Sequence, residues 1–251
     1  MLAAAMACLQ RERVHPAVEV VRLDRPARRN ALDSRTLSEL HAVLAELAGD
    51  PSLRALVLST TDPRALCAGA DVSEPVDAAG GLARMRAFAE VYAAIEAFPA
   101  ATVCVCVGHV VGAGAEIAAG CDLRVGGDNL RLAWAGARLG VPVGPARLAP
   151  LIGLSRARDL LFTGRVIGMD EAHAMGLLNR VAPADQAEAE ALTLGGQVAA
   201  NDAGGVRALK RMLREFEGLG PAERVAREND ILVEWQSGGP GLPSGRSPGD
   251  A

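Results

Sequence analysis

Two short turns rich in glycine and alanine carry backbone groups that could bind an anionic ligand. The first turn spans residues 68–71 (AGAD) and the second spans residues 112–116 (GAGAE), and each follows an apolar run. Small side chains let a ligand approach the backbone closely, and a helix that begins at such a turn directs unpaired N–H groups outward. Two such turns facing one point would form an oxyanion hole, which stabilises negative charge on a carbonyl oxygen. Taken separately, each turn is more typical of an ordinary strand-to-helix connection without a function.

Glu116 is the acidic side chain best suited to proton transfer. It lies one turn inside an apolar helix, beside Ala115 and Ile117, where burial of a carboxylate is costly without a partner or a purpose. Apolar surroundings raise the pKa of a carboxyl group, and this prepares the group for acid–base work near neutral pH. The alternative is a structural glutamate favoured by the dipole at a helix N-terminus.

Other kinds of catalytic site find less support in the sequence. Gly112 and Gly114 supply two glycines of a dinucleotide-binding fingerprint, but Ile117 stands where the third is needed. No His, Asp and Glu residues have the spacing of metal ligands, so we expect no metal. The G-x-S-x-G turn of a serine nucleophile is also absent from the sequence.

Apolar segments of strand length lead into these turns. The sequence predicts strands over residues 17–23, 55–60 and 101–107, because these runs are short and rich in apolar and β-branched residues. Leucines at helical spacing predict a helix that starts at a cap, Asp33 or Ser34, and ends at Gly49. Strands that alternate with helices indicate an α/β fold. A doubly wound sheet fits this alternation as well, and periodicity alone does not distinguish between the possible α/β arrangements.

The chain divides into three parts by composition. We predict a core of strand and helix units over residues 1–190 and a helical C-terminal part over residues 191–236. Residues 237–251 consist largely of Gly, Pro and Ser, which predicts a disordered tail.

Four segments in order along the chain resemble the crotonase family, the enoyl-CoA hydratase/isomerase superfamily. They are residues 23–32 (LDRPARRNAL), 66–74 (LCAGADVSE), 108–125 (GHVVGAGAEIAAGCDLRV) and 151–181 (LIGLSRARDLLFTGRVIGMDEAHAMGLLNRV). The resemblance implies a spiral of ββα units with two nearly perpendicular sheets and a helical C-terminal part. It also implies an enzyme of the lyase or isomerase type that acts on an acyl-CoA thioester and assembles as a homotrimer or as a hexamer of two trimers. Coenzyme A would enter as part of the substrate, with no separate cofactor.

The resemblance also assigns individual residues. Ala70 and Ala113 match the positions whose backbone N–H groups hold the thioester oxygen, and Glu116 matches one of two catalytic glutamates. The second glutamate position falls on Gly136. The positions that match the CoA-binding and substrate-binding segments are Arg28, Arg29, Ala31, Ala68, Gly69, Asp71, Val72 and Gly112.

Gly136 puts the hydratase mechanism of the family in doubt, because that mechanism uses two carboxylates on one water molecule. Asp71 and Asp128 could in principle supply a carboxylate, although a loop-capping role suits Asp71 better. The resemblance therefore leaves three functions open: an enoyl-CoA hydratase or isomerase with Glu116 as acid and base, an acyl-CoA decarboxylase, and a non-catalytic acyl-CoA carrier.

Composition and charge limit the partners. The chain has 26 Lys and Arg against 30 Asp and Glu, and only 3% of its residues are aromatic, which disfavours nucleic acid as a ligand. Five cysteines without a C-x-x-C pair are typical of the reducing cytoplasm. No uncharged apolar run reaches about 18 residues, so we expect no membrane span.

Overall fold

The computed structural model describes residues 7–238 of the 251-residue chain. These residues belong to two compact units, the first ending at Ala203 and the second beginning at Gly204. The first unit contains every segment that the sequence analysis associates with a site.

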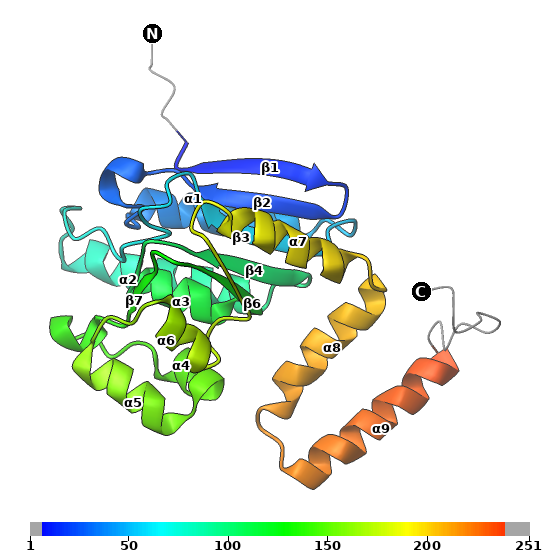
Figure 1. Cartoon of the computed structure of the whole chain (residues 1–251). Coiled ribbons are helices and arrows are strands. Elements are labelled where there is room, and N and C mark those ends of the chain that lie inside the picture. The colour runs from blue at the N-terminus through cyan, green and yellow to red at the C-terminus, as the bar shows by residue number, and fades with distance from the viewer. Residues whose placement is uncertain (1–6, 239–251) are drawn as a thin grey trace. The chain divides into compact units, whose positions relative to one another are not determined.

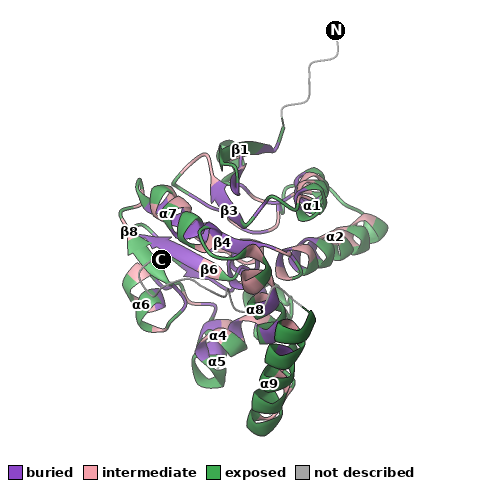
Figure 2. Cartoon of the chain, turned by 90° about the vertical axis from the view of Figure 1, so that its right-hand side faces the viewer, coloured by how far each residue is buried: buried purple, intermediate pink, exposed green. Residues whose placement is uncertain are grey.

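A six-stranded sheet forms the centre of the first unit (Figure 1). Its strands, in spatial order, are β1 (Leu9–His15), β2 (Val18–Leu23), β3 (Ala55–Thr60), β4 (Ala101–Cys106), β6 (Leu123–Gly127) and β8 (Arg180–Ala182). Only β1 is antiparallel to its neighbour, and the other pairs are parallel. The inner strands are buried on both faces, as parallel strands usually are. Figure 2 shows this buried layer between helices whose outer faces are exposed.

Alternate side chains of the inner strands reach two separate apolar layers. Leu56 and Leu58 pack with helices α1 (Ser34–Ala48), α2 (Ala78–Glu96) and α3 (Ala113–Gly120) on one face. On the other face, the alternate residue Val57 packs with helix α7 (Ala187–Ala199).

Short segments between the main strands form a second layer. Strand β5 (His109–Val111) pairs in parallel with β7 (Arg131–Ala133), and a single bridge joins Cys67 to Val110. Each strand–helix unit therefore adds one strand to the large sheet and a short pairing segment beside it. The strands of the large sheet follow chain order without the reversal that defines a doubly wound sheet, so the predicted α/β spiral is confirmed.

After residue 140 the described chain is mainly helical, and β8 is its one strand there. The first unit contains α4 (Pro145–Ile152), α5 (Leu154–Thr163) and α6 (Met169–Ala174), preceded by two short 3₁₀ helices, η1 (Pro26–Arg28) and η2 (Gly136–Leu139). The remaining helices are α8 (Ala203–Phe216) and α9 (Pro221–Gly238). Across residues 7–238, no helix combines the length and the hydropathy that crossing a bilayer would require.

The predicted division of the chain has a boundary after residue 190, which lies inside α7. Helix α7 packs on strands β2, β3, β4 and β6, and the first compact unit extends to Ala203. The predicted tail, residues 237–251, lies outside the described residues except for Ser237 and Gly238, which end α9.

Candidate active site

The two turns predicted to bind a carbonyl oxygen run side by side in the same direction. The N–H of Cys67 donates to the carbonyl of His109 at 3.1 Å, and the N–H of Val111 donates to the carbonyl of Cys67 at 2.9 Å. This is the parallel bridge that pairs Cys67 with Val110. Ala70 and Ala113 each lie three residues beyond the paired residues, so the bridge brings the two predicted donors to corresponding positions on adjacent segments.

Both predicted donor amides are left unpaired by the surrounding backbone. The parallel bridge from Leu32 uses the carbonyl of Gly69 and the N–H of Asp71, and passes over the N–H of Ala70. Ala113 is the first residue of α3, where a helix provides no acceptor for the N–H. Within residues 7–238, neither amide donates a hydrogen bond.

Glycine permits the close approach of these two segments. A Cβ atom on Gly114 would lie 2.3 Å from the carbonyl oxygen of Cys67, so any side chain would push α3 away from the first turn. Gly69 has φ +110°, a conformation that L-residues with side chains rarely adopt. The spacing of small residues is therefore a requirement of the backbone geometry at this site.

Glu116 is fully buried on α3, and both oxygens of its carboxylate are held. The indole Nε1 of Trp134 donates to Oε1 at 2.7 Å, and the guanidinium of Arg147 donates to Oε2 at 2.9 Å. Burial raises the pKa of Glu116, while the hydrogen bonds from Trp134 and Arg147 oppose that rise. The group is therefore a buried carboxyl with a raised pKa in a fixed orientation, as a general acid–base residue requires.

Gly136, to which the resemblance assigns the second glutamate position, has no space for a side chain. A Cβ atom there would lie 2.5 Å from the carbonyl oxygen of Val141 and 2.9 Å from Cγ1 of Val143. The segment from η2 to Val143 is folded tightly over Gly136, whose carbonyl accepts from the N–H of Val141 at 2.9 Å. The local backbone is therefore built around glycine at this position.

Asp71 and Asp128, which were considered as sources of a second carboxylate, both accept hydrogen bonds from other parts of the chain. The carboxylate of Asp71 accepts from the N–H of Ser73 at 3.1 Å and from its hydroxyl at 2.6 Å, and pairs with Arg25 at 3.1 Å. The bonds from Ser73 lower the pKa of Asp71 most strongly. Asp128 is exposed and accepts from the N–H of Ala184 at 2.9 Å. Asp71 thus fixes the turn that follows Ala70, next to the exposed Val72.

Two of the predicted CoA-binding segments meet in the structure. The exposed Arg28 and Arg29 lie in and just after η1, and the carbonyl of Arg29 accepts from the N–H of Ala68 at 3.0 Å. One residue beyond Ala31, the N–H of Leu32 donates to the carbonyl of Gly69. The arginine-rich turn is therefore fixed directly beside the first glycine- and alanine-rich turn.

Asn30 supports this arrangement and escaped the sequence analysis. It is buried with φ +54°, and its side chain accepts from the N–H of Arg25 at 2.7 Å and donates to the carbonyl of Ala65 at 2.9 Å. It also donates to the hydroxyl of Thr60 at 2.7 Å. Asparagine tolerates the left-handed conformation better than most residues, which was the available sequence signal.

Replacing Asn30 with alanine should loosen this turn. Loss of its buried hydrogen bonds leaves donors and acceptors unpaired, and we expect the free energy of unfolding to fall by about 1–3 kcal/mol. Urea denaturation measures the change. Asn201→Ala, at an exposed asparagine that follows α7, is the control; an equal loss in both variants would show that Asn30 has no special role.

Known proteins of one family are similar to this chain in sequence and in fold. The model of the enoyl-CoA hydratase/isomerase family matches residues 13–237. The 2,3-dehydroadipyl-CoA hydratase of Escherichia coli is 31% identical over 221 residues, which cover 86% of this chain and 86% of that protein. An enoyl-CoA hydratase structure from Bacillus anthracis superposes with a TM-score of 0.86 at 24% identity, covering 90% of each chain, and shows the fold alone. One from Mycobacterium smegmatis has a TM-score of 0.83 at 25% identity, covering 92% of this chain and 91% of that one. The chain belongs to the enoyl-CoA hydratase/isomerase family.

Proposed function

We propose that this protein acts on an acyl-CoA thioester through an enolate whose oxygen is held by the N–H groups of Ala70 and Ala113. Glu116 exchanges the proton at the carbon next to the thioester. The observation that carries the proposal is the parallel pairing of the two turns, which leaves two free amides at matching positions near a buried carboxyl. Such donors stabilise charge on a carbonyl oxygen without reorganisation during the reaction.

The proposal includes how the substrate is held. The CoA portion lies along the arginine-rich turn and the first oxyanion turn, in contact with Arg28, Arg29, Ala31, Ala68, Gly69, Asp71, Val72 and Gly112. The E. coli relative is named as a hydratase of an unsaturated acyl-CoA, which supports a 2,3-enoyl-CoA as the substrate for hydration or double-bond isomerisation. We propose a homotrimer, or a hexamer of two trimers, in the cytoplasm as the working form.

A second candidate function is favoured by Gly136. Hydration in this family uses two carboxylates on one water molecule, whereas loss of CO₂ from a malonyl-type thioester needs only a stabilised enolate and a proton donor. Two amides and one carboxyl supply these groups. A non-catalytic acyl-CoA carrier would need the amides alone.

Two substrates and one binding measurement separate these functions. Crotonyl-CoA hydration is followed by loss of the absorbance of the conjugated thioester, and malonyl-CoA decarboxylation by formation of acetyl-CoA. We expect turnover of the enoyl-CoA. Turnover of malonyl-CoA alone would establish the second candidate, and calorimetric binding of both without turnover would establish a carrier. Failure to bind any acyl-CoA would overturn the proposal altogether.

Restoring the second glutamate should fail because of the backbone around Gly136. We expect Gly136→Glu to reduce the free energy of unfolding by about 1–3 kcal/mol through overpacking against Val141 and Val143, with no gain in hydration. Thermal unfolding and the crotonyl-CoA assay measure the two effects. Gly81→Glu is the control, because a Cβ atom on Gly81 meets nothing within 4 Å. A stable Gly136→Glu enzyme that hydrates faster would contradict the expectation.

A further inference from the structure

Three charged side chains form a row that begins at the buried carboxylate of Glu116. The guanidinium of Arg147 donates to Glu116 at 2.9 Å and forms an ion pair with Glu96 through its Nε. Arg147 is therefore shared between the carboxylates of Glu116 and Glu96.

The row connects the interior with the surface. The side chain of Glu116 is 0% exposed, that of Arg147 is 21% exposed and that of Glu96 is 38% exposed. Three helices supply the row, since Glu116 lies on α3, Arg147 on α4 and Glu96 at the end of α2. A change in charge at the surface member can thus reach the buried carboxyl through a single guanidinium.

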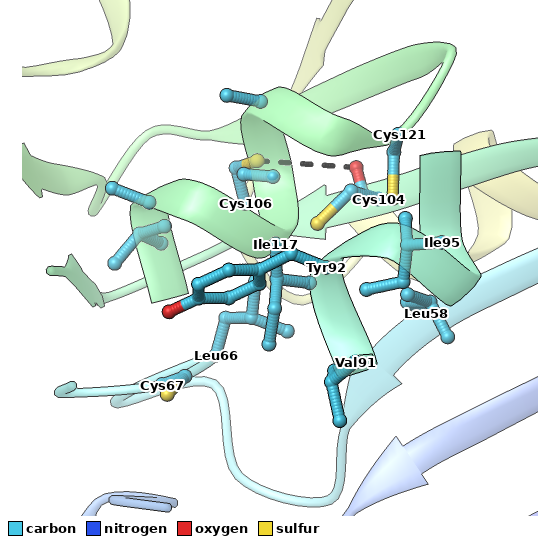
Figure 3. Packing of buried hydrophobic residues seen from close by; sticks show 14 of the residues in the cluster. Leu58, Leu66, Cys67, Val91, Tyr92, Ile95, Cys104, Cys106, Ile117 and Cys121 are labelled. Carbon is cyan, nitrogen blue, oxygen red and sulfur yellow. Dashed lines mark hydrogen bonds between the residues drawn. The ribbon is translucent and has the colours of Figure 1, made fainter. Parts of the chain in front are cut away.

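Aromatic side chains fix the row in place. The guanidinium carbon of Arg147 lies 4.8 Å from the centroid of the Tyr92 ring, a cation–π contact. In Figure 3 the Tyr92 ring lies within the apolar cluster that contains Ile117, Leu66 and Cys67. On the other side of the carboxylate, the indole of Trp134 donates to Glu116. Arg147 and Glu116 consequently have little freedom to separate.

Other titratable groups near α3 do not replace this row. Burial raises the pKa of Tyr92 far above its usual range and that of Cys67 to about 12, so both stay neutral at physiological pH. Burial lowers the pKa of His109. Tyr92 of α2 lies against Arg147, and the buried guanidinium of Arg124 on β6 donates to the carbonyls of Ala118 and Cys121 at the C-terminal end of α3.

We infer that Glu96 and Arg147 are positioning residues that together set the charge of Glu116, with Glu96 acting from the protein surface. The consequence of this charge control for catalysis rests on the proposed function, in which Glu116 exchanges the substrate proton. The positive charge of Arg147 favours the ionised form of Glu116. Glu96 disfavours that form in two ways, because its negative charge repels the carboxylate of Glu116 and because it competes for the same guanidinium.

Arg147 and Glu96 therefore have opposite effects on the pKa of Glu116. Removing the charge of Arg147 leaves the burial of Glu116 uncompensated and raises its pKa further. Removing the charge of Glu96 releases Arg147 to Glu116 alone and lowers that pKa. A role in packing alone would not produce shifts in opposite directions.

Trp134 provides a readout that is independent of activity. Its indole N–H donates directly to the carboxylate of Glu116, so its ¹H–¹⁵N resonance should move as Glu116 takes up a proton. The chain has only two tryptophans, and Trp235→Phe assigns the remaining signal to Trp134. Glu116→Gln should abolish the pH dependence of that signal and so identifies Glu116 as its source.

The experiment compares the midpoint of this titration in the full-length protein and three variants. We expect Arg147→Met to raise the midpoint by about 1–3 pH units and Arg147→Lys, which retains the charge, to stay closer to the wild type. Glu96→Gln should lower it by up to about 1 pH unit. The acid limb of the kcat/KM profile should move in the same directions, because the base must be ionised.

The outcomes separate this inference from the proposed function. Equal midpoints in all variants, or shifts of Arg147→Met and Glu96→Gln in the same direction, would overturn the inference even if the enzyme is active. Opposite shifts of the Trp134 signal in a protein without acyl-CoA turnover would support the inference while the proposed function fails. Glu96→Gln keeps the shape of the side chain at position 96 and leaves the ion pair between Glu116 and Arg147 intact. If Arg147→Met does not fold, the shift measured in Glu96→Gln alone therefore tests the inference.

Discussion

Glu116→Gln should reduce kcat about 100- to 10,000-fold, the usual contribution of a general acid–base residue. Glutamine retains the shape of the side chain and can still accept the hydrogen bond from Trp134, but it cannot exchange a proton. Since the proposed CoA contacts lie on other segments, the dissociation constant for crotonyl-CoA should change little. Steady-state kinetics and calorimetric binding measure the two quantities separately.

A matched control is available on a neighbouring helix. Glu90 is an exposed glutamate of α2, and Glu90→Gln should leave both kcat and the melting temperature near the wild-type values. A Glu116→Gln variant that is folded, binds crotonyl-CoA and turns it over at the wild-type rate would remove Glu116 from the mechanism. The remaining function would then depend on the backbone amides alone.

Ala113→Pro should remove one oxyanion donor with little damage to the fold. Proline has no N–H, and the first position of a helix is where proline is tolerated. Loss of one such donor lowers kcat by about 100- to 1,000-fold, or about 2.7–4 kcal/mol of transition-state stabilisation. The measurements are kcat with crotonyl-CoA and the melting temperature.

Ala113→Ser serves as the comparison for this variant, because it alters the side chain but keeps the backbone N–H. We expect it to retain most of the activity. If Ala113→Pro and Ala113→Ser lose activity to the same extent, the side chain at position 113 matters and the amide does not. If Ala113→Pro is fully active and folded, the oxyanion hole lies elsewhere.

Local signals in the sequence were sufficient for the elements that carry the site. The strand predicted over residues 55–60 is β3 with the same limits, and the predicted cap Asp33 accepts from the N–H of Thr36 at 2.8 Å. The helix expected after the second turn begins at Ala113. These features depend on residues close together in the chain, where periodicity and capping chemistry are informative.

Features that depend on distant contacts were not predictable in this way. Arg147 shows no local sign that it pairs with Glu116, which is 31 residues away. Strand β1 exposes almost every residue, so its sequence shows no alternation of apolar residues. The amphipathic pattern of α7 likewise does not reveal that this helix covers the large sheet.

The order of the strands has a consequence for how the protein is made. From β2 onward, every strand of the large sheet pairs with the strand synthesised just before it in that sheet, so each can join an existing edge as it leaves the ribosome. Helix α7 arrives only at residues 187–199, and until then the valines of β2, β3, β4 and β6 on that face have no cover. A nascent chain that ends before α7 therefore exposes a continuous apolar surface on this face of the sheet. Chaperones bind such surfaces, and unfolded chains aggregate through them.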